Sequence, residues 1–292
     1  MCWLCDFKHQ DAGADAPASG SHRWSSRRGF MLAAAATSAA AAATPAMAQV
    51  NVGPPSSMRK LVPAETLESA ASQQYLQMMR EAHGKGALLP ESDPQVRRLH
   101  TIARRLIPHA AAWNPRARDW KWQVQLIRSD QINAFCMPGG KIGFFTGILD
   151  QLQLDDDETA MIMGHEMAHA LREHARERVA KSSATDIGLR LGAALLGLGD
   201  LGNMAAGMGS QLLSLKYSRD DETDADLVGL ELAARGAYRP KASVSLWQKM
   251  ARAGGSGGPG FLSTHPSGPN RIRELEANVP KVQGLYEKAR RG

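Results

Sequence analysis

Cysteine and aromatic residues are scarce in this chain, and each shortage excludes a class of protein. Three cysteines occur among 292 residues, and two of them, Cys2 and Cys5, lie close to the N-terminus. Beyond them only Cys136 remains, so the rest of the chain cannot form an internal disulfide and must be stabilised by the packing of its core. Aromatic residues make up 5% of the chain and form no stripe with basic residues, so nucleic-acid binding is not expected despite a net charge of +6.

Apolar runs are also short, and the one near the N-terminus has the features of an export signal. Arg27 and Arg28 precede an alanine-rich run at 32–43, which is followed by the small-x-small cleavage pattern Ala46-Met47-Ala48. This order predicts a secretory signal of the twin-arginine type at residues 1–48, cleaved after Ala48, and therefore a periplasmic protein. The run is too weakly apolar to predict a membrane span, and no cysteine at the cleavage point offers a site for a lipid anchor. The alternatives are a retained N-terminal anchor and an alanine-rich leader without a function.

After the leader, the chain is predicted to form one domain. Residues 49–63 are polar and contain proline, which indicates a flexible lead-in, and residues 64–292 show no repeats and no room for a second folded domain. The segment 187–215 is apolar and rich in glycine, and neither of its halves is long enough to span a membrane. We expect a helical hairpin there, which either fills the core or forms a hydrophobic flap that contacts unfolded chains or a membrane surface.

Hydrophobic periodicity predicts a mostly helical α+β domain with a small sheet. The expected helices are 64–82, 93–107, 146–152, 155–181, 220–234, 241–253 and a short one that begins at 270. The expected strands are 120–126, 134–137 and 141–145, with a Pro-Gly-Gly turn that joins the last two in a hairpin. The helix at 155–181 carries the strongest signals, because Asp155 and Glu158 resemble a capping box at its start.

The residues with the clearest chemical potential are His165-Glu166-Met167-Ala168-His169, in the middle of the helix at 155–181. Residues four apart project from one face of a helix, so His165 and His169 can share one zinc ion. Glu166 can then reach a water molecule at the open position of the metal and act as the general base. The motif therefore predicts one Zn²⁺ per chain and hydrolysis by activated water; the alternative is a solvated helix face that carries these residues by chance.

A catalytic zinc site needs a third protein ligand, and His174 is not expected to supply it. On a continuous helix, His174 lies about 140° around the axis from His169, which predicts a surface residue near the helix C-terminus. An extended motif with a third histidine is also excluded, because Arg172 and Ala175 occupy the places that would need glycine and histidine.

Two carboxylates further along the chain have a more suitable spacing. Glu222 and Asp226 lie four residues apart on the helix expected at 220–234. Glu222 can be the third ligand, and Asp226 can orient a ligand histidine through its free ring N–H. Acid-rich helix starts are also common on solvated surfaces, which is the alternative for this pair.

In combination these motifs resemble one family of enzymes. H-E-x-x-H followed by S-R-x-x-E-x-x-A-D at 218–226 is similar to the gluzincin metallopeptidases of the HtpX and CAAX-prenyl endopeptidase family. The resemblance includes 133–140, Thr264-His265-Pro266-Ser267 and Arg271-Ile272, and it covers about 124–275. It implies a zincin-like domain with His165, His169 and Glu222 as zinc ligands, Glu166 as the base and Asp226 behind a ligand.

Within this family, the chain resembles the short, single-domain periplasmic branch. It has no segment after the leader that is long enough to span a membrane, unlike the membrane-embedded members, and it lacks the C-terminal helical repeats of the larger periplasmic members. The resemblance implies unfolded or misfolded envelope proteins as substrates and the outer-membrane assembly machinery as a partner.

Two features beside this site carry further hypotheses. Residues 133–145 are expected to form a hairpin whose exposed edge either holds an extended substrate by strand addition or is purely structural. Cys136 in this hairpin is expected to be a small core residue. His265 follows a glycine-rich stretch, and it either stabilises the oxyanion, caps the zinc as a fourth ligand in a latent state, or is a structural loop histidine.

The sequence thus predicts a zinc endopeptidase that cleaves misfolded or stalled proteins of the cell envelope. A chaperone-like outer-membrane assembly factor, which holds unfolded chains in the same groove without significant proteolysis, is the first alternative. A purely structural zinc protein is the second, although Glu166 would then have no task.

Overall fold

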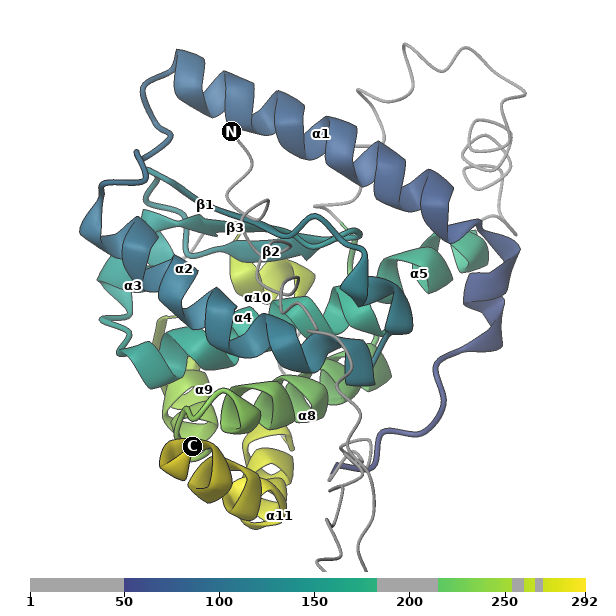
Figure 1. Ribbon diagram of the computed structural model, residues 1–292, viewed down its shortest axis with the longest axis vertical. Coiled ribbons are helices and arrows are strands. Elements are labelled where there is room, and N and C mark those ends of the chain that lie inside the picture. The colour runs from purple at the N-terminus through teal and green to yellow at the C-terminus, as the bar shows by residue number, and fades with distance from the viewer. Residues whose placement is uncertain (1–49, 183–214, 254–259, 266–269) are drawn as a thin grey trace, which may run out of the picture. The chain divides into compact units, whose positions relative to one another are not determined.

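The computed structural model describes residues 50–182, 215–253, 260–265 and 270–292 (Figure 1). The predicted leader at 1–48 and nearly all of the predicted hairpin at 187–215 lie outside the described residues. The domain boundaries inferred from the sequence therefore stay predictions. Among the described residues, no helix combines the length and the apolar character that a bilayer crossing requires. As predicted, the fold is of the α+β class, with many helices around a small sheet.

The sheet has three strands, β1 (Gln123–Ile127), β2 (Ala134–Met137) and β3 (Lys141–Phe145), in the order β1-β3-β2. β2 and β3 are antiparallel and form the predicted hairpin, whereas β1 runs parallel to β3. The turn of the hairpin needs glycine, because Gly139 and Gly140 both have a positive φ and a side chain at Gly140 would collide with Trp122. Because the strand order is β1-β3-β2, strand β2 forms one edge of the sheet.

Strand β1 begins three residues later than the alternating pattern predicts. Trp120 and Trp122 are buried, but they pack against each other, with their ring centroids 5.3 Å apart. The indole N–H of Trp122 donates to the carbonyl oxygen of Ala117, and the indole N–H of Trp120 donates to Glu68. Trp120 and Trp122 are therefore buried because they pack in the core before β1 begins, and not because they belong to the strand.

Helix α1 (Ala64–Gly84) packs on one face of the sheet (Figure 1). Its buried positions Leu67, Ala71, Tyr75 and Met79 are four residues apart, so they form a single apolar stripe. The hydroxyl of Tyr75 donates to the carbonyl oxygen of Ile142 over 2.9 Å. This bond fixes the helix to the central strand.

The opposite face of the sheet is covered by α2 (Pro94–Leu106) and α4 (Asp156–Leu171), as Figure 1 shows. Asp93 caps α2 by accepting a hydrogen bond from the backbone N–H of Gln95 at 2.8 Å. α4 begins with the capping box predicted from Asp155 and Glu158, which accept hydrogen bonds from each other's backbone N–H groups. Nearly all of α4 is buried, as expected for a helix covered on every side.

The remaining elements complete the layers around α4. α8 (Arg219–Arg235) packs directly on α4, and α9 (Ala242–Ala253) and α11 (Arg271–Arg291) pack around these two helices. α11 has 21 residues, so the prediction of a short final helix was wrong. The shorter elements are η2 (Ser57–Leu61), η3 (Ile107–Ala112), η4 (Pro115–Arg118), α3 (Thr146–Gln151), α5 (His174–Ser182) and α10 (Phe261–Thr264).

The single helix predicted at 155–181 is in fact two helices. α4 ends at Leu171, and α5 starts at His174 in a new direction (Figure 1). Between them Glu173 adopts a left-handed conformation with φ of 61°, which ends an α-helix. The carboxylate of Glu173 forms ion pairs with Arg59 and Arg176, and these pairs stabilise the turn between α4 and α5.

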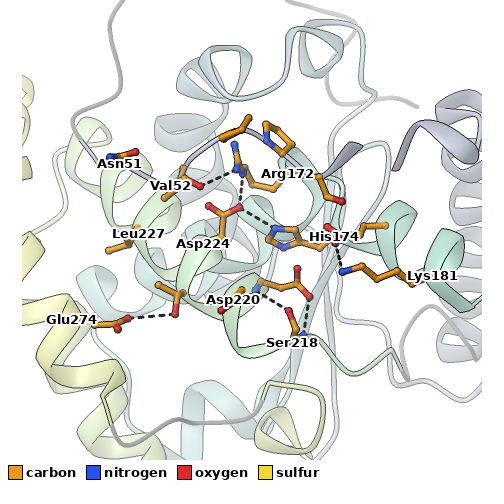
Figure 2. Close-up of a pocket in the computed structure, with 16 residues that line it drawn as sticks. Asn51, Val52, Arg172, His174, Lys181, Ser218, Asp220, Asp224, Leu227 and Glu274 are labelled. Atoms are coloured by element: carbon orange, nitrogen blue, oxygen red, sulfur yellow. Dashed lines mark hydrogen bonds and ion pairs between the residues drawn. The ribbon is translucent and has the colours of Figure 1, made fainter. Parts of the chain in front are cut away.

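The segment that precedes α1 lies along α5 and α8. The backbone N–H of Val50 donates to Glu231 over 3.0 Å, and Arg172 donates to the carbonyl oxygen of Gly53 over 2.9 Å. η2 packs on α5, where Arg176 donates to the carbonyl oxygen of Val62. Figure 2 shows the polar pocket that this segment forms together with α5 and the first turns of α8.

α4 and α8 contact each other through their backbones at Gly164 and Gly229. A methyl group on Gly229 would lie 2.6 Å from the backbone nitrogen of His165, and a methyl group on Gly164 would lie 2.7 Å from the carbonyl oxygen of Gly229. No real side chain fits at these distances, so both positions require glycine. The contact brings the helix that carries His165 and His169 directly against the helix that carries Glu222.

We therefore expect Gly229→Ala to lower the free energy of unfolding by about 1–3 kcal/mol, because the methyl group forces α4 and α8 apart. Gly284→Ala is the matched control, since Gly284 lies within α11 and a methyl group there meets no atom within 4 Å. That change should leave stability equal or raise it by up to about 1 kcal/mol. Urea unfolding of the two variants decides the point, and equal stability of both would contradict the close contact.

Candidate metal centre

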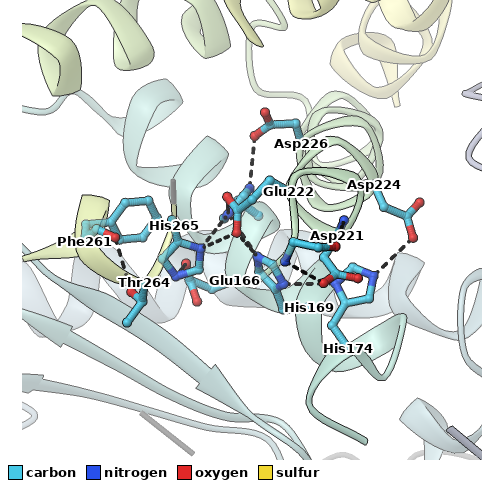
Figure 3. Close-up of polar contacts among 12 residues, drawn as sticks. Glu166, His169, His174, Asp221, Glu222, Asp224, Asp226, Phe261, Thr264 and His265 are labelled. Atoms are coloured by element: carbon cyan, nitrogen blue, oxygen red, sulfur yellow. Dashed lines mark hydrogen bonds and ion pairs between the residues drawn. The ribbon is translucent and has the colours of Figure 1, made fainter. Parts of the chain in front are cut away.

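Four buried side chains converge between α4, α8 and the end of α10 (Figure 3). His165 and His169 project from α4, Glu222 comes from the first turn of α8, and His265 follows α10 directly. The Nε2 atoms of His165 and His169 are 3.1 Å apart, and the Nδ1 atom of His265 is 3.0 Å from Oε1 of Glu222. One nitrogen or oxygen atom of each residue lies within 4.8 Å of the others, so this group of four could hold a metal ion. We refer to these four residues as the ligand cluster.

The protonation states of the ligand cluster suit a divalent cation. Burial lowers the pKa of His165 and of His169, so both imidazoles are neutral at pH 7. Burial would raise the pKa of Glu222, but hydrogen bonds from His169 and His265 outweigh it and hold that pKa well below its usual range. Neutral imidazoles and an ionised carboxylate are the forms that bind metal. A set of three nitrogens and one oxygen fits zinc in particular.

Glu166 lies beside the ligand cluster but has a different environment. It is 3% exposed, and its Oε1 atom has no hydrogen-bond partner among the described residues. Nε2 of His265 is 3.5 Å away from that oxygen atom. Burial raises the pKa of Glu166 to about 7, against the opposing positive charge of His265. A carboxyl group with a pKa near neutrality can both accept and release a proton at physiological pH.

Asp226 lies behind His165, on the side away from the ligand cluster. Its Oδ1 atom is 3.0 Å from Nδ1 of His165, which is the contact that orients a metal-binding imidazole. Arg271, from the start of α11, donates to both carboxylate oxygens of Asp226 and also lies 2.9 Å from Glu222. The guanidinium carbon is 3.3 Å from the ring centre of Trp247, so Arg271 is held between two acids and an aromatic face.

His174 is not the surface residue that the sequence predicts. It is 3% exposed, and its Nδ1 atom lies 2.9 Å from Nδ1 of His169. The prediction was wrong because it assumed a continuous helix, whereas the left-handed residue Glu173 turns the chain and brings His174 back beside His169. His174 remains outside the ligand cluster, as the sequence predicts.

Two aromatic rings enclose the ligand cluster, and sequence reasoning gave neither a role. Tyr217 stacks on His169 with ring centroids 3.9 Å apart, and Phe261 stacks on His265 at 4.2 Å. The sequence indicates Arg271 only as part of a motif, without a function. The contacts of Tyr217 and Arg271 join elements far apart in the chain, and Phe261, although it is four residues from His265, has no sequence signal that distinguishes it from a core residue.

A narrow pocket opens beside Glu166. It is lined by β2, from Asn133 to Pro138, together with Glu166, Ala175, Leu215, Tyr217, Thr264 and His265. The thiol of Cys136 is buried, as predicted, and its burial raises its pKa well above the usual value. An edge strand thus lines the same pocket as Glu166, the carboxyl group with the raised pKa, and His265.

All six residues that the sequence indicates for the site are therefore close together: His165, Glu166, His169, Glu222, Asp226 and His265. Residues 94–279 match Peptidase family M48. The chain belongs to peptidase family M48. The narrower resemblance to the HtpX and CAAX-prenyl endopeptidase group is not confirmed, because the curated relatives have other names.

Three of these relatives illustrate the range of similarity. Mitochondrial metalloendopeptidase OMA1 of Schizosaccharomyces pombe is 34% identical over 216 residues, which cover 73% of this chain and 61% of the relative. Metalloprotease LoiP of Escherichia coli is 24% identical over 202 residues, 68% of this chain and 76% of the relative. Beta-barrel assembly-enhancing protease of Yersinia pestis is 25% identical over 198 residues, 63% of this chain and 39% of the relative. The chain thus spans about three fifths of the length of the fission-yeast protein.

The predicted location was wrong. A periplasmic protein with a twin-arginine signal was expected, but relatives from fungi, a plant and vertebrates are named as mitochondrial proteins. The prediction depended on a basic flank and an alanine-rich run, and basic leaders of similar composition also address proteins to other compartments. That pattern is therefore not specific enough to assign a location.

The raised pKa of Glu166 predicts a dependence of stability on pH. In the metal-free protein the folded state holds a proton on Glu166 up to about pH 7, whereas the unfolded chain releases it near pH 4.5. Stability is therefore lost as the pH rises through this interval, and the loss is complete above about pH 7. Glu166→Gln should remove the loss and stabilise the metal-free protein at pH 8 by up to about 3 kcal/mol more than at pH 4.5.

Chemical denaturation of the metal-free protein at both pH values measures this difference. Glu91→Gln is the control, because Glu91 is exposed and should show no such change. The same stability change for Glu166→Gln at both pH values would contradict the raised pKa.

Proposed function

We propose that this protein is a zinc-dependent endopeptidase with His165, His169 and Glu222 as the zinc ligands and Glu166 as the general base. The observation that carries the proposal is the position of Glu166. Its buried carboxyl group, with a pKa near 7, directly follows His165 and precedes His169 by three residues in α4, and it lines the pocket beside β2. A purely structural zinc site does not need such a group.

Each residue has a defined task in this reaction. Bound zinc would act as a Lewis acid, which would polarise the scissile carbonyl group and lower the pKa of water at neutral pH. Glu166 accepts a proton when water attacks the peptide carbon, and it passes the proton on to the nitrogen of the leaving amine. Asp226 holds the ring of His165 through Nδ1, and Arg271 neutralises Asp226 and Glu222 where both are buried.

Strand β2 is the proposed binding surface for the substrate backbone. The backbone N–H of Phe145 donates to Asn133, and in an antiparallel pair such residues alternate with residues whose polar groups point the other way. Ala134 and Cys136 therefore direct their N–H and C=O groups away from β3, toward the pocket that contains Glu166. An extended peptide added to this edge places successive peptide bonds beside the ligand cluster, whatever their side chains.

This mode of binding supports unfolded or misfolded proteins as substrates, because only an extended chain can pair with β2. The name of the Yersinia pestis relative refers to β-barrel assembly, and it supports stalled or misfolded outer-membrane proteins, and the machinery that assembles them, as the finer class of substrates and partners.

His265 is proposed as a fourth ligand in a latent state. Its ring contributes to the ligand cluster, with Nδ1 3.3 Å from Nε2 of His165. A fourth protein ligand would occupy the position that water needs, and a closed four-coordinate zinc site is not catalytic. The alternative role as an oxyanion donor requires the ring to leave the ligand cluster and face the substrate.

The second candidate is a chaperone-like assembly factor that uses the same groove without significant proteolysis. The edge of β2 favours it as well, since strand addition holds an unfolded chain without cutting it. The two candidates differ in whether Glu166 is needed.

Glu166→Gln is expected to retain zinc and to reduce casein cleavage by about 10²–10⁴-fold, because the amide cannot accept the proton. Zinc content by atomic absorption and the rate of cleavage of fluorescent casein are measured on the same preparations. Glu91→Gln, an exposed carboxyl group, is the matched control and should match the unchanged protein. Equal cleavage by Glu166→Gln and the unchanged protein would refute this mechanism, and a binding activity preserved without any cleavage in either would favour the chaperone.

His265→Ala separates the two roles of that residue. If His265 is the latent ligand, basal cleavage rises and zinc affinity falls, because one ligand is lost and the water position opens. A fall in kcat with unchanged zinc affinity would instead assign the oxyanion role. His83→Ala removes an exposed histidine and should change neither quantity.

A further inference from the structure

The two histidines of α4 are supported in different ways. On the side away from the ligand cluster, Nδ1 of His165 meets the carboxylate of Asp226, which Arg271 holds in place. Among the residues that the structure describes, the partner of the corresponding atom of His169 is not a carboxylate but the ring of another histidine, His174, at 2.9 Å. The support of His169 is thus one residue longer than that of His165.

The ring of His174 continues to a carboxylate. Its Nε2 atom lies 3.2 Å from Oδ2 of Asp224, and the same oxygen accepts a hydrogen bond from Nε of Arg172 at 2.6 Å (Figures 2 and 3). The side chains of His174, Arg172 and Asp224 are 3%, 5% and 14% exposed. An acid paired with an arginine therefore ends both chains of contacts, Asp226 with Arg271 and Asp224 with Arg172.

The ring protons of His169 and His174 can be assigned in order, starting at the ligand cluster and ending at Asp224. When zinc is bound, Nε2 of His169, which faces His165 and Glu222, must offer its lone pair to the metal, so the ring proton then belongs on Nδ1. Nδ1–H of His169 then donates to Nδ1 of His174, which leaves the second proton on Nε2 of His174. That proton is donated to Asp224, so every nitrogen has one role and no two protons meet.

We propose that His174 and Asp224 act as a positioning relay for His169, which locks its ring and its Nδ1–H tautomer so that Nε2 points into the ligand cluster. This inference rests on the proposed zinc site. The relay does not touch the substrate or the metal, and it acts only through His169. In metal sites generally, the partner on the far side of a histidine ligand contributes about 10–100-fold to metal affinity.

The relay is anchored to the segment that precedes α1. Arg172, which holds Asp224, also donates to the carbonyl oxygen of Gly53 at 2.9 Å. Asp224 lines the polar pocket between this segment, α5 and α8, so one end of the relay is close to solvent while the other end is fully buried (Figure 2). The left-handed residue Glu173 is what turns His174 toward His169.

Zinc affinity of the metal-free protein tests the relay without reference to cleavage. His174→Leu fills the same space but cannot accept a hydrogen bond, so zinc affinity should fall by about 10–100-fold. His174→Asn keeps an acceptor close to the position of Nδ1 and should stay within about threefold of the unchanged protein. His83→Ala is the control for the loss of a histidine, because His83 is exposed, and it should bind zinc as the unchanged protein does. Competition with a chromophoric chelator gives the dissociation constants.

A second measurement needs no variant. In the zinc-loaded, unchanged protein labelled with ¹⁵N-histidine, the nitrogen chemical shifts should show the proton of His169 on Nδ1 and the proton of His174 on Nε2. A proton on Nδ1 of His174, or equal zinc affinity for His174→Leu and the unchanged protein, would overturn the relay. If the unchanged protein itself binds no zinc, the proposed function fails, and that result is distinct from a failure of the relay alone.

Discussion

The contact between α4 and α8 at Gly164 and Gly229 determines where every other part of the site lies. Packed helices are normally 8–10 Å apart because side chains separate them, and the two glycines remove that separation. Glu222, Asp226 and Gly229 lie on one face of α8, at spacings of four and three residues, so the same close approach delivers both carboxylates to the histidines of α4. The sheet and α1 provide the rigid support behind β2, and α9 and α11 close the opposite side.

Burial then decides the charge of each group. The side chains of the site are buried, so an ionised group persists there only if other groups compensate its charge. The charges of Glu222 and Asp226 are compensated by Arg271 and the imidazoles, whereas His265, the positive group beside Glu166, lies 3.5 Å from its Oε1 atom. Burial therefore dominates at Glu166 and raises its pKa to about 7. The same burial thus leaves one carboxyl group ionised, which suits a metal ligand, and one that can gain or lose a proton near neutral pH, which suits the proposed base.

Local signals in the sequence predicted much of the fold, and the errors have a common cause. The hairpin of β2 and β3 and the capping box of α4 were predicted correctly, because a Gly-Gly turn and an acid pair three residues apart act over a few residues. The predicted start of β1 was wrong because Trp120 and Trp122 are buried by packing against each other ahead of the strand. The break after Leu171 was missed because Glu173, which has no glycine-like signature, is held left-handed by arginines from other elements.

The sequence by itself was enough to propose His165 and His169 as metal ligands, Glu166 as the base, and Glu222 and Asp226 as a carboxylate pair with suitable spacing. These depend on helical periodicity, which repeats every 3.6 residues and can be read without the fold. Only the tertiary structure decided that His174 lies behind His169, that Arg271 joins two acids and that Tyr217 and Phe261 stack on the imidazoles. The contacts of Arg271 and Tyr217 join residues 45 to 49 positions apart, and His174 reaches His169 only because the chain turns at Glu173. Neither this turn nor the close approach of α4 and α8 at two glycines is encoded in a local pattern.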